Sequence, residues 1–507
     1  MKDKWKKIIL WRPRPWQVAL GMAALLLLAL LPLYRLAFYA IPWYDDYMFG
    51  RFVKDYLAEE RSLRSALEGA VYCARTQWYA WQGCFSCSFL NSLVPIVWGE
   101  DLYFLGPVFL ITILTVSVFV LMQVLIRNVL GADQLSSITL STAWTITVIM
   151  QIHTAQAGFY WYVGGIAYVA MHSFFLLLTA GWVRLLTKPG KVTTVLLVIW
   201  TMAAAVAVGG ANFVTGLQGA VLGVSLCVLG VLLKKKQTLF LLPSVMINLF
   251  CFYKSVSAPG NSVRGGAFEA IGLGMGPLEA IGNSFVEAFR NIGEFTGLIT
   301  VAIIITLLPI IRRMLRQIEF SFRYPGLVLL GSFCFYAMGY TPGLYAMGHG
   351  GLGRTLNVVK ITYQILLLLN LIYWLGWADR KWRQREILKM FDNGAPLLFY
   401  VVMGGLMLGI FALEPNQAGS YSAYGAYYYV HTGEANELHK EYLARVEKIV
   451  SGGPVVEVTP YHFRPWFLMA DDLKADQDNE ANRAMADWYG KVGIICASEG
   501  TGQNDLE

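Results

Sequence analysis

Charged residues are scarce in this chain. Lys, Arg, Asp and Glu make up 14% of its 507 residues, whereas hydrophobic residues make up 56%. Soluble proteins keep roughly a quarter of their residues charged. Most of the surface therefore faces something other than water, which argues against a soluble protein. The net charge of +7 is scattered between apolar runs, so nucleic acid is not an expected partner.

Acidic residues are missing from the long apolar runs. A spanning helix needs about 20 largely apolar residues, and eleven runs meet this pattern. None of them contains Asp or Glu, and Lys360 is the one Lys or Arg inside a run. Proton- and ion-coupled transporters place carboxylates near the membrane midplane, so this absence argues against a pump or a secondary transporter. The predicted spans are 18–34, 102–126, 135–156, 162–183, 192–209, 216–233, 238–253, 295–311, 325–340, 355–378 and 395–413.

Cysteines are also few, and three of the seven fall between the first two predicted spans. These are Cys73, Cys84 and Cys87. The Cys84-x-x-Cys87 pair has no second pair or His nearby, which favours a disulfide or free thiols over a metal site. The chain contains no HExxH motif and no phosphate-binding P-loop.

The distribution of Lys and Arg predicts how the chain is oriented in the membrane. The basic N-terminus leads into an apolar run with no clear cleavage site, which predicts a retained signal anchor. Basic residues gather in the even-numbered connections, whereas the short odd-numbered ones hold only Arg354. Short basic loops stay in the cytoplasm. We therefore expect a multi-pass protein of a bacterial plasma membrane, with a cytoplasmic N-terminus and an extracytoplasmic C-terminus.

The long connections all fall on the predicted outer side. They are the first outer loop at 35–101, the segment 254–294 and the acidic tail at 414–507. The sequence thus predicts a membrane-embedded module over 1–413 and an extracytoplasmic C-terminal region over 414–507. Function is expected on this outer face, because binding residues concentrate on such loops.

Apolar periodicity predicts local structure in these segments. We expect two interfacial helices, one strand and two further helices that make the tail a small α/β unit. The helices are expected around Leu63–Val71, around Leu278–Phe289, near 434–450 and near 478–490, and the strand at Val455–Thr459.

Two adjacent acids stand out directly after the first span. Asp45 and Asp46 lie between Trp43-Tyr44 and Tyr47, at membrane level. Adjacent like charges at a partly desolvated position cost free energy unless something uses or neutralises them. Such a carboxylate could deprotonate an incoming hydroxyl. The alternative is an ordinary helix start with acids in its first turn.

The order of motifs resembles the glycosyltransferase-C superfold. After the paired acids come Phe159-Tyr-Trp-Tyr-Val-Gly-Gly165, then Ala258-Pro-Gly-Asn-Ser-Val-Arg264, and then His349-Gly-Gly-Leu-Gly-Arg354. The resemblance covers about residues 1–413. It implies an all-α polytopic fold that transfers a sugar from a polyprenyl-phosphate donor to a cell-envelope glycan or lipid acceptor outside the membrane, with inversion.

The resemblance also implies roles for particular residues. Asp45 or Asp46 would be the catalytic base, and some enzymes of this superfold use a divalent metal, Mg or Mn, near the acids; the sequence does not decide this. Arg264 and Arg354 lie close to span ends, where their guanidinium groups could bind the phosphate. The tryptophans could stack on sugar faces or simply belong to the interfacial aromatic belt. The full set of expected substrate-binding residues is Arg264, Arg354, His349, Trp78, Trp81, Trp161, Tyr44 and Asn261.

Two other functions fit parts of the pattern. One is a lipid-linked glycan flippase or polymerase, in which outer arginines act without paired acids. The other is a non-catalytic scaffold that docks cell-wall enzymes through the tail at 414–507.

Overall fold

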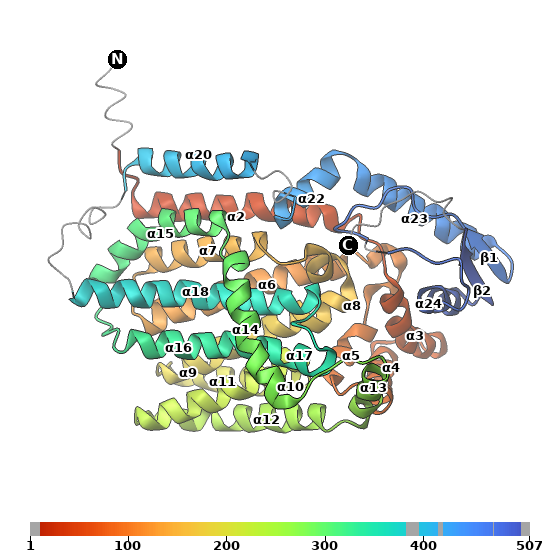
Figure 1. Ribbon diagram of the computed structural model, residues 1–507, viewed down its shortest axis with the longest axis horizontal. Helices are drawn as coiled ribbons and strands as arrows, with labels where there is room; N and C mark the ends of the chain where they lie inside the picture. Colours follow the sequence, from red (N-terminus) through yellow and green to blue (C-terminus); the bar gives the residue numbers. More distant parts are fainter. Residues whose placement is uncertain (1–10, 382–394, 414–418, 470, 498–507) are drawn as a thin grey trace, which may run out of the picture.

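The protein is a bundle of long apolar helices with a small α/β unit at one end (Figure 1). The computed structural model describes residues 11–381, 395–413, 419–469 and 471–497. Within these residues, eight helices are long and apolar enough to cross a membrane. They are α2 (Pro15–Ala37), the helical stretch Glu100–Val129 that contains α6 (Leu105–Gln123), the stretch Tyr162–Leu186 formed by α8 (Tyr162–Gly165) and α9 (Met171–Leu186), α10 (Lys191–Gly209), α11 (Phe213–Leu232), α15 (Leu298–Gln317), the stretch Pro325–Met347 formed by α16 (Pro325–Ala337) and α17 (Thr341–Met347), and α18 (Gly353–Lys381).

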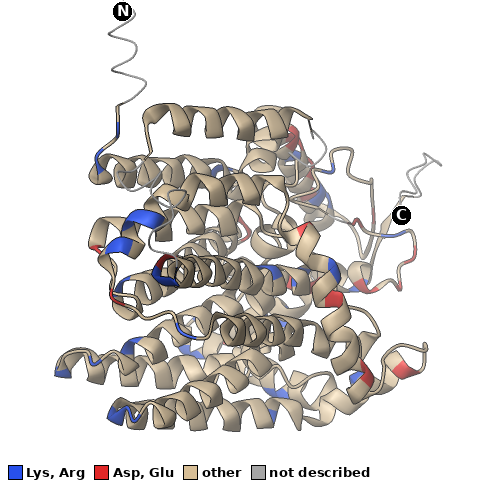
Figure 2. Ribbon diagram, turned by 60° about the vertical axis from the view of Figure 1, so that its left-hand side comes forward, with Lys and Arg blue, Asp and Glu red and all other residues tan. Residues whose placement is uncertain are grey.

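All eleven predicted runs coincide with helices, but three of these helices are shorter. They are α7 (Gln134–Met150), α12 (Leu242–Val256) and α20 (Leu397–Leu413), with 17, 15 and 17 residues. The prediction of an all-α membrane protein is therefore confirmed, whereas the number of spans stays a prediction. Figure 2 shows Lys and Arg at both ends of the bundle and most Asp and Glu toward the end that carries the α/β unit. This distribution agrees with the expected orientation without fixing it.

The segment after the first span folds into three helices. These are α3 (Tyr44–Glu59), α4 (Leu63–Ala80) and α5 (Phe85–Ser92). The amphipathic helix expected around 63–71 is α4. Its small residues Ala66 and Ala70 are fully buried, while Leu63 is 68% exposed. A Cβ at Gly69 would lie 2.9 Å from the carbonyl oxygen of Phe52, so glycine allows α4 to cross α3 closely.

The second predicted interfacial helix is α14 (Pro277–Phe295), which follows α13 (Pro259–Glu269). It runs across the direction of the spans in Figure 1. Leu278 and Phe289 are exposed on it, whereas Ala280 and Ala288 are buried against the bundle. This amphipathic division matches the apolar spacing in the sequence.

The tail folds into an α/β unit, which we call the cap and define as residues 422–497. It consists of α22 (Ser422–His431), α23 (Glu434–Ser451), β1 (Val455–Val458), α24 (Glu480–Tyr489) and β2 (Gly493–Cys496). The strands pair in parallel, with Val455 opposite Gly493. The predicted strand and both predicted helices are confirmed. β2, with the sequence Gly-Ile-Ile-Cys, was not predicted, because it lacks the alternation of apolar and polar residues that marks β1.

A buried ion pair organises the interior of the cap. Arg445 donates to Asp472 Oδ1 at 2.6 Å and to the carbonyl of Thr459, also at 2.6 Å. Both charged side chains are at most 6% exposed. The guanidinium also lies 3.4 Å from the ring centroid of Tyr461. Because these charges are desolvated, removal of Asp472 leaves a buried guanidinium without its carboxylate, and removal of Arg445 leaves Asp472 with the more distant Arg464, at 4.0 Å.

The cap packs on α3. Trp488 lies against Gly50, where a Cβ would come within 3.2 Å of the indole. Arg51 pairs with Asp487, and Lys54 donates to the carbonyl of Trp488. The cap is therefore attached to the helix that begins with the two adjacent acids.

Candidate active site

Asp46 anchors the start of α3. It is fully buried, and its carboxylate accepts hydrogen bonds from the backbone N–H of Trp43 at 2.8 Å, the hydroxyl of Tyr103 at 2.7 Å and the backbone N–H of Val163 at 3.0 Å. Burial raises the pKa of Asp46 to about 7, although these bonds oppose the shift. The helix-start alternative thus describes Asp46, which ties α3 to Tyr103, two residues before α6, and to α8.

Asp45 is the acid that remains free to react. It is the second residue of α3, partly buried, and no hydrogen bond to its side chain is found within the described part of the chain. Burial raises its pKa to about 6; Arg354 opposes this rise and Glu480 adds to it. A carboxylate with a pKa close to neutrality is suited to accept a proton near physiological pH.

Arg354 lies near Asp45 although the two residues are far apart in the sequence. It lies in the first turn of α18, with its guanidinium carbon 5.3 Å from the ring centroid of Trp161 and 5.8 Å from that of Tyr168. Trp161 in turn packs against Trp43 at 5.5 Å, directly before α3. Ring contacts and electrostatics therefore agree that Asp45 and Arg354 flank one site.

This site contains buried donors without acceptors. In the described residues, Nε of Arg354, Nε1 of Trp161 and Oγ1 of Thr154 are buried and make no hydrogen bond. Thr154 lies beside the start of α18, since a Cβ on Gly353 would be 3.1 Å from its hydroxyl. Buried polar atoms are nearly always paired. Together with the positive end of α18, these donors make a site for an anion or a hydroxylated ligand.

The cap contributes charges that the sequence did not reveal. Glu480, the first residue of α24, acts on both Asp45 and Tyr44, and Asp471 acts on Tyr44. Burial and the neighbouring Asp45 raise the pKa of the Tyr44 phenol. No local pattern marks Glu480, because it reaches the site only through the packing of α24 on α3.

A tyrosine network fixes the cap near this site. Glu100 accepts from the hydroxyl of Tyr489 at 2.6 Å and from that of Tyr442 at 3.2 Å. Tyr442 also contacts the hydroxyl of Tyr47 at 3.3 Å. Burial raises the pKa of all three phenols above the usual range, so they stay protonated and can donate. Tyr47 follows Asp46 in α3, so the network extends from the acids to the cap.

Four predicted binding residues lie together elsewhere, where α13 meets α4. Arg264 donates to the side chain of Gln82 and lies 5.8 Å from the ring of Trp81. Asn261 accepts from the backbone N–H of Gly83 at 2.9 Å, and Trp78 donates to the carbonyl of Lys254 at 3.1 Å. These contacts join α4 to α12 and α13. Arg264 is not among the charges that shift the pKa of Asp45.

His349 occupies the turn before α18. Its Nδ1 accepts from the backbone N–H of Gly351 at 3.2 Å. Gly348 and Gly351 have φ values of +74° and +119°, which glycine adopts without strain. The turn therefore determines where α18 and Arg354 begin, and His349 contributes to its shape.

A metal shared by the two aspartates does not fit this geometry. The oxygens of Asp46 accept three hydrogen bonds, so they face donors rather than a cation. In the described part of the chain, no group of three His, Cys, Asp or Glu is arranged to hold a metal ion. The structure has free, buried thiols at Cys73, Cys84 and Cys87. Of the two alternatives, a disulfide or free thiols, it therefore contains free thiols. We derive no step through a metal.

Ring contacts and electrostatics thus gather Asp45, Arg354, Trp161 and Tyr44. Arg264, Asn261, Trp78 and Trp81 lie apart from them, where α13 meets α4, and Nε of Arg264 is also buried there without a hydrogen bond among the described residues. No family model, no curated protein and no solved structure matches this chain.

Proposed function

We propose that the protein is a membrane glycosyltransferase that moves a sugar from a polyprenyl-phosphate donor to a hydroxyl of a cell-envelope acceptor. The observation that carries the proposal is that the charge of Arg354 acts on Asp45 beside buried donors that lack acceptors. A base for the acceptor and a cation for the departing phosphate are the two groups that this chemistry needs.

The reaction is a single displacement. Asp45 takes the proton of the acceptor hydroxyl, whose oxygen forms a bond to the anomeric carbon. The bond between that carbon and the phosphate oxygen breaks, and its electron pair leaves with the polyprenyl phosphate. Arg354 binds this phosphate through the charge-assisted hydrogen bonds that its fork provides. One displacement inverts the anomeric configuration.

This reaction assigns roles to the predicted residues. Asp45 is the base, and Asp46 positions it by holding the first turn of α3. Arg354 is the phosphate ligand, and Trp161 offers its unpaired N–H beside it. Arg264 is assigned to the junction of α4 and α13, because its contacts are with Gln82, Trp81 and Phe268.

The test is sugar transfer in proteoliposomes supplied with a radiolabelled polyprenyl-phosphate sugar. Asp45→Asn should lower the rate about 10²-fold or more, in the range measured for general bases. Asp55→Asn is the matched control, because Asp55 lies on the same helix with a side chain 69% exposed. Arg354→Gln should abolish transfer, whereas Arg264→Gln should retain most of it.

The same variants separate the alternatives. A flippase or polymerase that relies on arginines alone would lose activity in Arg354→Gln and keep it in Asp45→Asn. Full activity in Asp45→Asn with correctly folded protein would remove the proposed base, and with it this proposal.

A further inference from the structure

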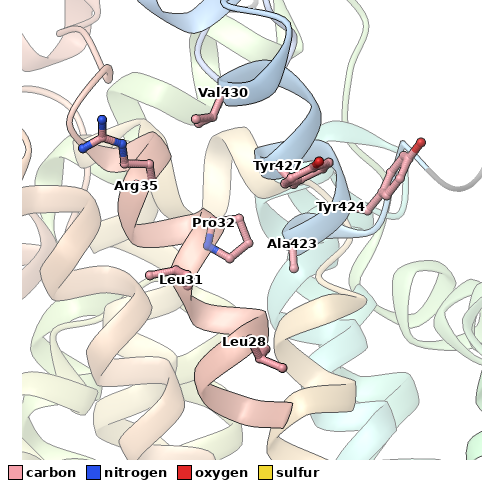
Figure 3. A pocket seen from close by; sticks show the side chains of 8 residues that line it. All are labelled: Leu28, Leu31, Pro32, Arg35, Ala423, Tyr424, Tyr427 and Val430. Carbon is pink, nitrogen blue, oxygen red and sulfur yellow. The ribbon is translucent and has the colours of Figure 1, made fainter. Parts of the chain in front are cut away.

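An apolar groove lies apart from the candidate active site: neither Asp45 nor Arg354 lines it. It has a volume of about 430 Å³ and is formed by α2 and α22. Figure 3 shows its walls: Leu28, Leu31, Pro32 and Arg35 from α2, and Ala423, Tyr424, Tyr427 and Val430 from α22. This volume falls within the range of sites that bind small ligands.

The two faces of α2 have different environments. Leu33 and Leu36 are fully buried, and the carbonyl of Leu33 accepts a hydrogen bond from Tyr160 on the inner side. Leu28 and Leu31 are 65% and 67% exposed. Because α2 is apolar enough to span a membrane, this exposed face meets hydrocarbon chains.

Arg35 gives the groove a polar end. It lies in the last turn of α2, is exposed, and makes no hydrogen bond or ion pair with any residue described by the structure. Its guanidinium carbon lies 5.9 Å from the ring centroid of Tyr39. The cation also favours the helix C-terminus, but that interaction leaves its N–H donors available. An unpaired guanidinium at the end of a span lies where lipid phosphates lie.

We propose that this groove binds one anionic glycerophospholipid. One acyl chain lies along Leu28, Leu31 and Ala423, and the phosphate accepts hydrogen bonds from Arg35. Tyr424 and Tyr427 flank the chain near the headgroup, as aromatic side chains do at membrane interfaces. Charge complementarity favours a lipid of net negative charge over a zwitterionic one, and a single cation near the surface contributes about a fivefold preference.

The bound lipid would join the first span to the cap. α22 leads directly into α23, whose Tyr442 belongs to the network around Glu100. A ligand that binds only the assembled groove stabilises the folded state by mass action. The lipid therefore acts as a structural component between α2 and the cap, and this role does not depend on the proposed reaction.

The experiment uses the full chain in nanodiscs of phosphatidylcholine with a minor share of phosphatidylglycerol, followed by native mass spectrometry of the retained lipids. The wild type should retain one phosphatidylglycerol in preference to phosphatidylcholine. Arg35→Gln should lose the preference, whereas Arg75→Gln, at another exposed arginine, should keep it. Leu31→Trp should occlude the groove and lose the lipid. Leu27→Trp is the matched control, because Leu27 is 69% exposed on the same helix outside the groove.

Three results would overturn the proposal. Equal retention in Arg35→Gln and the wild type would show that the guanidinium binds no phosphate. Loss of the lipid in Leu27→Trp as well as Leu31→Trp would show that the groove is not its site. Displacement of phosphatidylglycerol by equimolar polyprenyl phosphate would assign the groove to a polyprenyl carrier.

Discussion

Replacement of Asp45 by Asn should stabilise the folded protein at neutral pH. The same replacement should abolish the proposed sugar transfer. Burial raises the pKa of Asp45 from 3.8 to about 6, and one pKa unit equals about 1.36 kcal/mol. The folded protein therefore keeps this carboxylate ionised at neutral pH at a cost of about 3 kcal/mol. Asn carries no charge, so the variant avoids that cost. Active sites commonly show such a conflict between stability and function.

The sign of the effect depends on pH. The folded-state pKa is raised, so the protonated acid is fully compatible with the folded state below pH 3.8, and stability is lost as the pH rises from there to about 6. The gain in Asp45→Asn should accordingly be largest at pH 7.5 and shrink toward pH 4. Thermal unfolding in nanodiscs at both pH values measures it.

The matched control is Asp55→Asn on the same helix. Asp55 has an exposed side chain, so this variant should change the midpoint little at either pH. A stabilisation of Asp45→Asn that is equal at pH 4 and pH 7.5, or no stabilisation at all, would refute the argument that Asp45 is a desolvated carboxylate.

Three further variants test the surroundings of the site. Asp46→Ala, measured at pH 4.5 where Asp46 is protonated in the folded state, should lower the free energy of unfolding by roughly 2–6 kcal/mol, because two buried backbone N–H groups lose their acceptor; an unchanged midpoint would contradict its anchoring role. Arg445→Met should destabilise the cap by up to about 3–5 kcal/mol, since the buried Asp472 loses its closest cation and keeps the more exposed Arg464 at 4.0 Å, and hydrogen exchange over β1 and β2 reports the loss; slow exchange in both strands would contradict it. Glu480→Gln should lower the pKa of Asp45, because it removes a neighbouring negative charge. The infrared titration of Asp45, obtained as the difference from Asp45→Asn, should then move toward acid; an unchanged titration would show that Glu480 does not act on Asp45.

The helices were predictable because their signals are local. Long apolar runs mark the membrane-spanning helices, and helical spacing of apolar residues marks α4, α14, α23 and α24. The number of helices that cross the membrane could not be predicted in the same way. α7 carries many Ser and Thr side chains, several of which donate to carbonyls of their own helix, such as Thr145 to Ser141. Hydrophobicity alone does not decide whether such a helix spans.

The site was predictable only in part, because its members meet through tertiary contacts. The paired acids were visible, but the sequence could not separate their roles. That separation comes from Tyr103 and Val163, which donate to Asp46 and leave Asp45 free. Arg264 and Arg354 looked equivalent as basic residues near span ends. Only the packing of α13 on α4 and of α18 beside Trp161 distinguishes them.

The cap changes how the scaffold alternative should be tested. Deletion of residues 420–507 would separate an enzyme from a docking platform only if the tail were independent of the membrane module. It is not independent, because Trp488 packs on Gly50, and Tyr442 and Tyr489 donate to Glu100. Deletion would expose α3 and remove Glu480 from the surroundings of Asp45, so an enzyme and a scaffold would both fail. Glu480→Gln keeps the cap folded and changes one charge beside Asp45. An enzyme should respond with a shifted pH profile, whereas a scaffold should not respond.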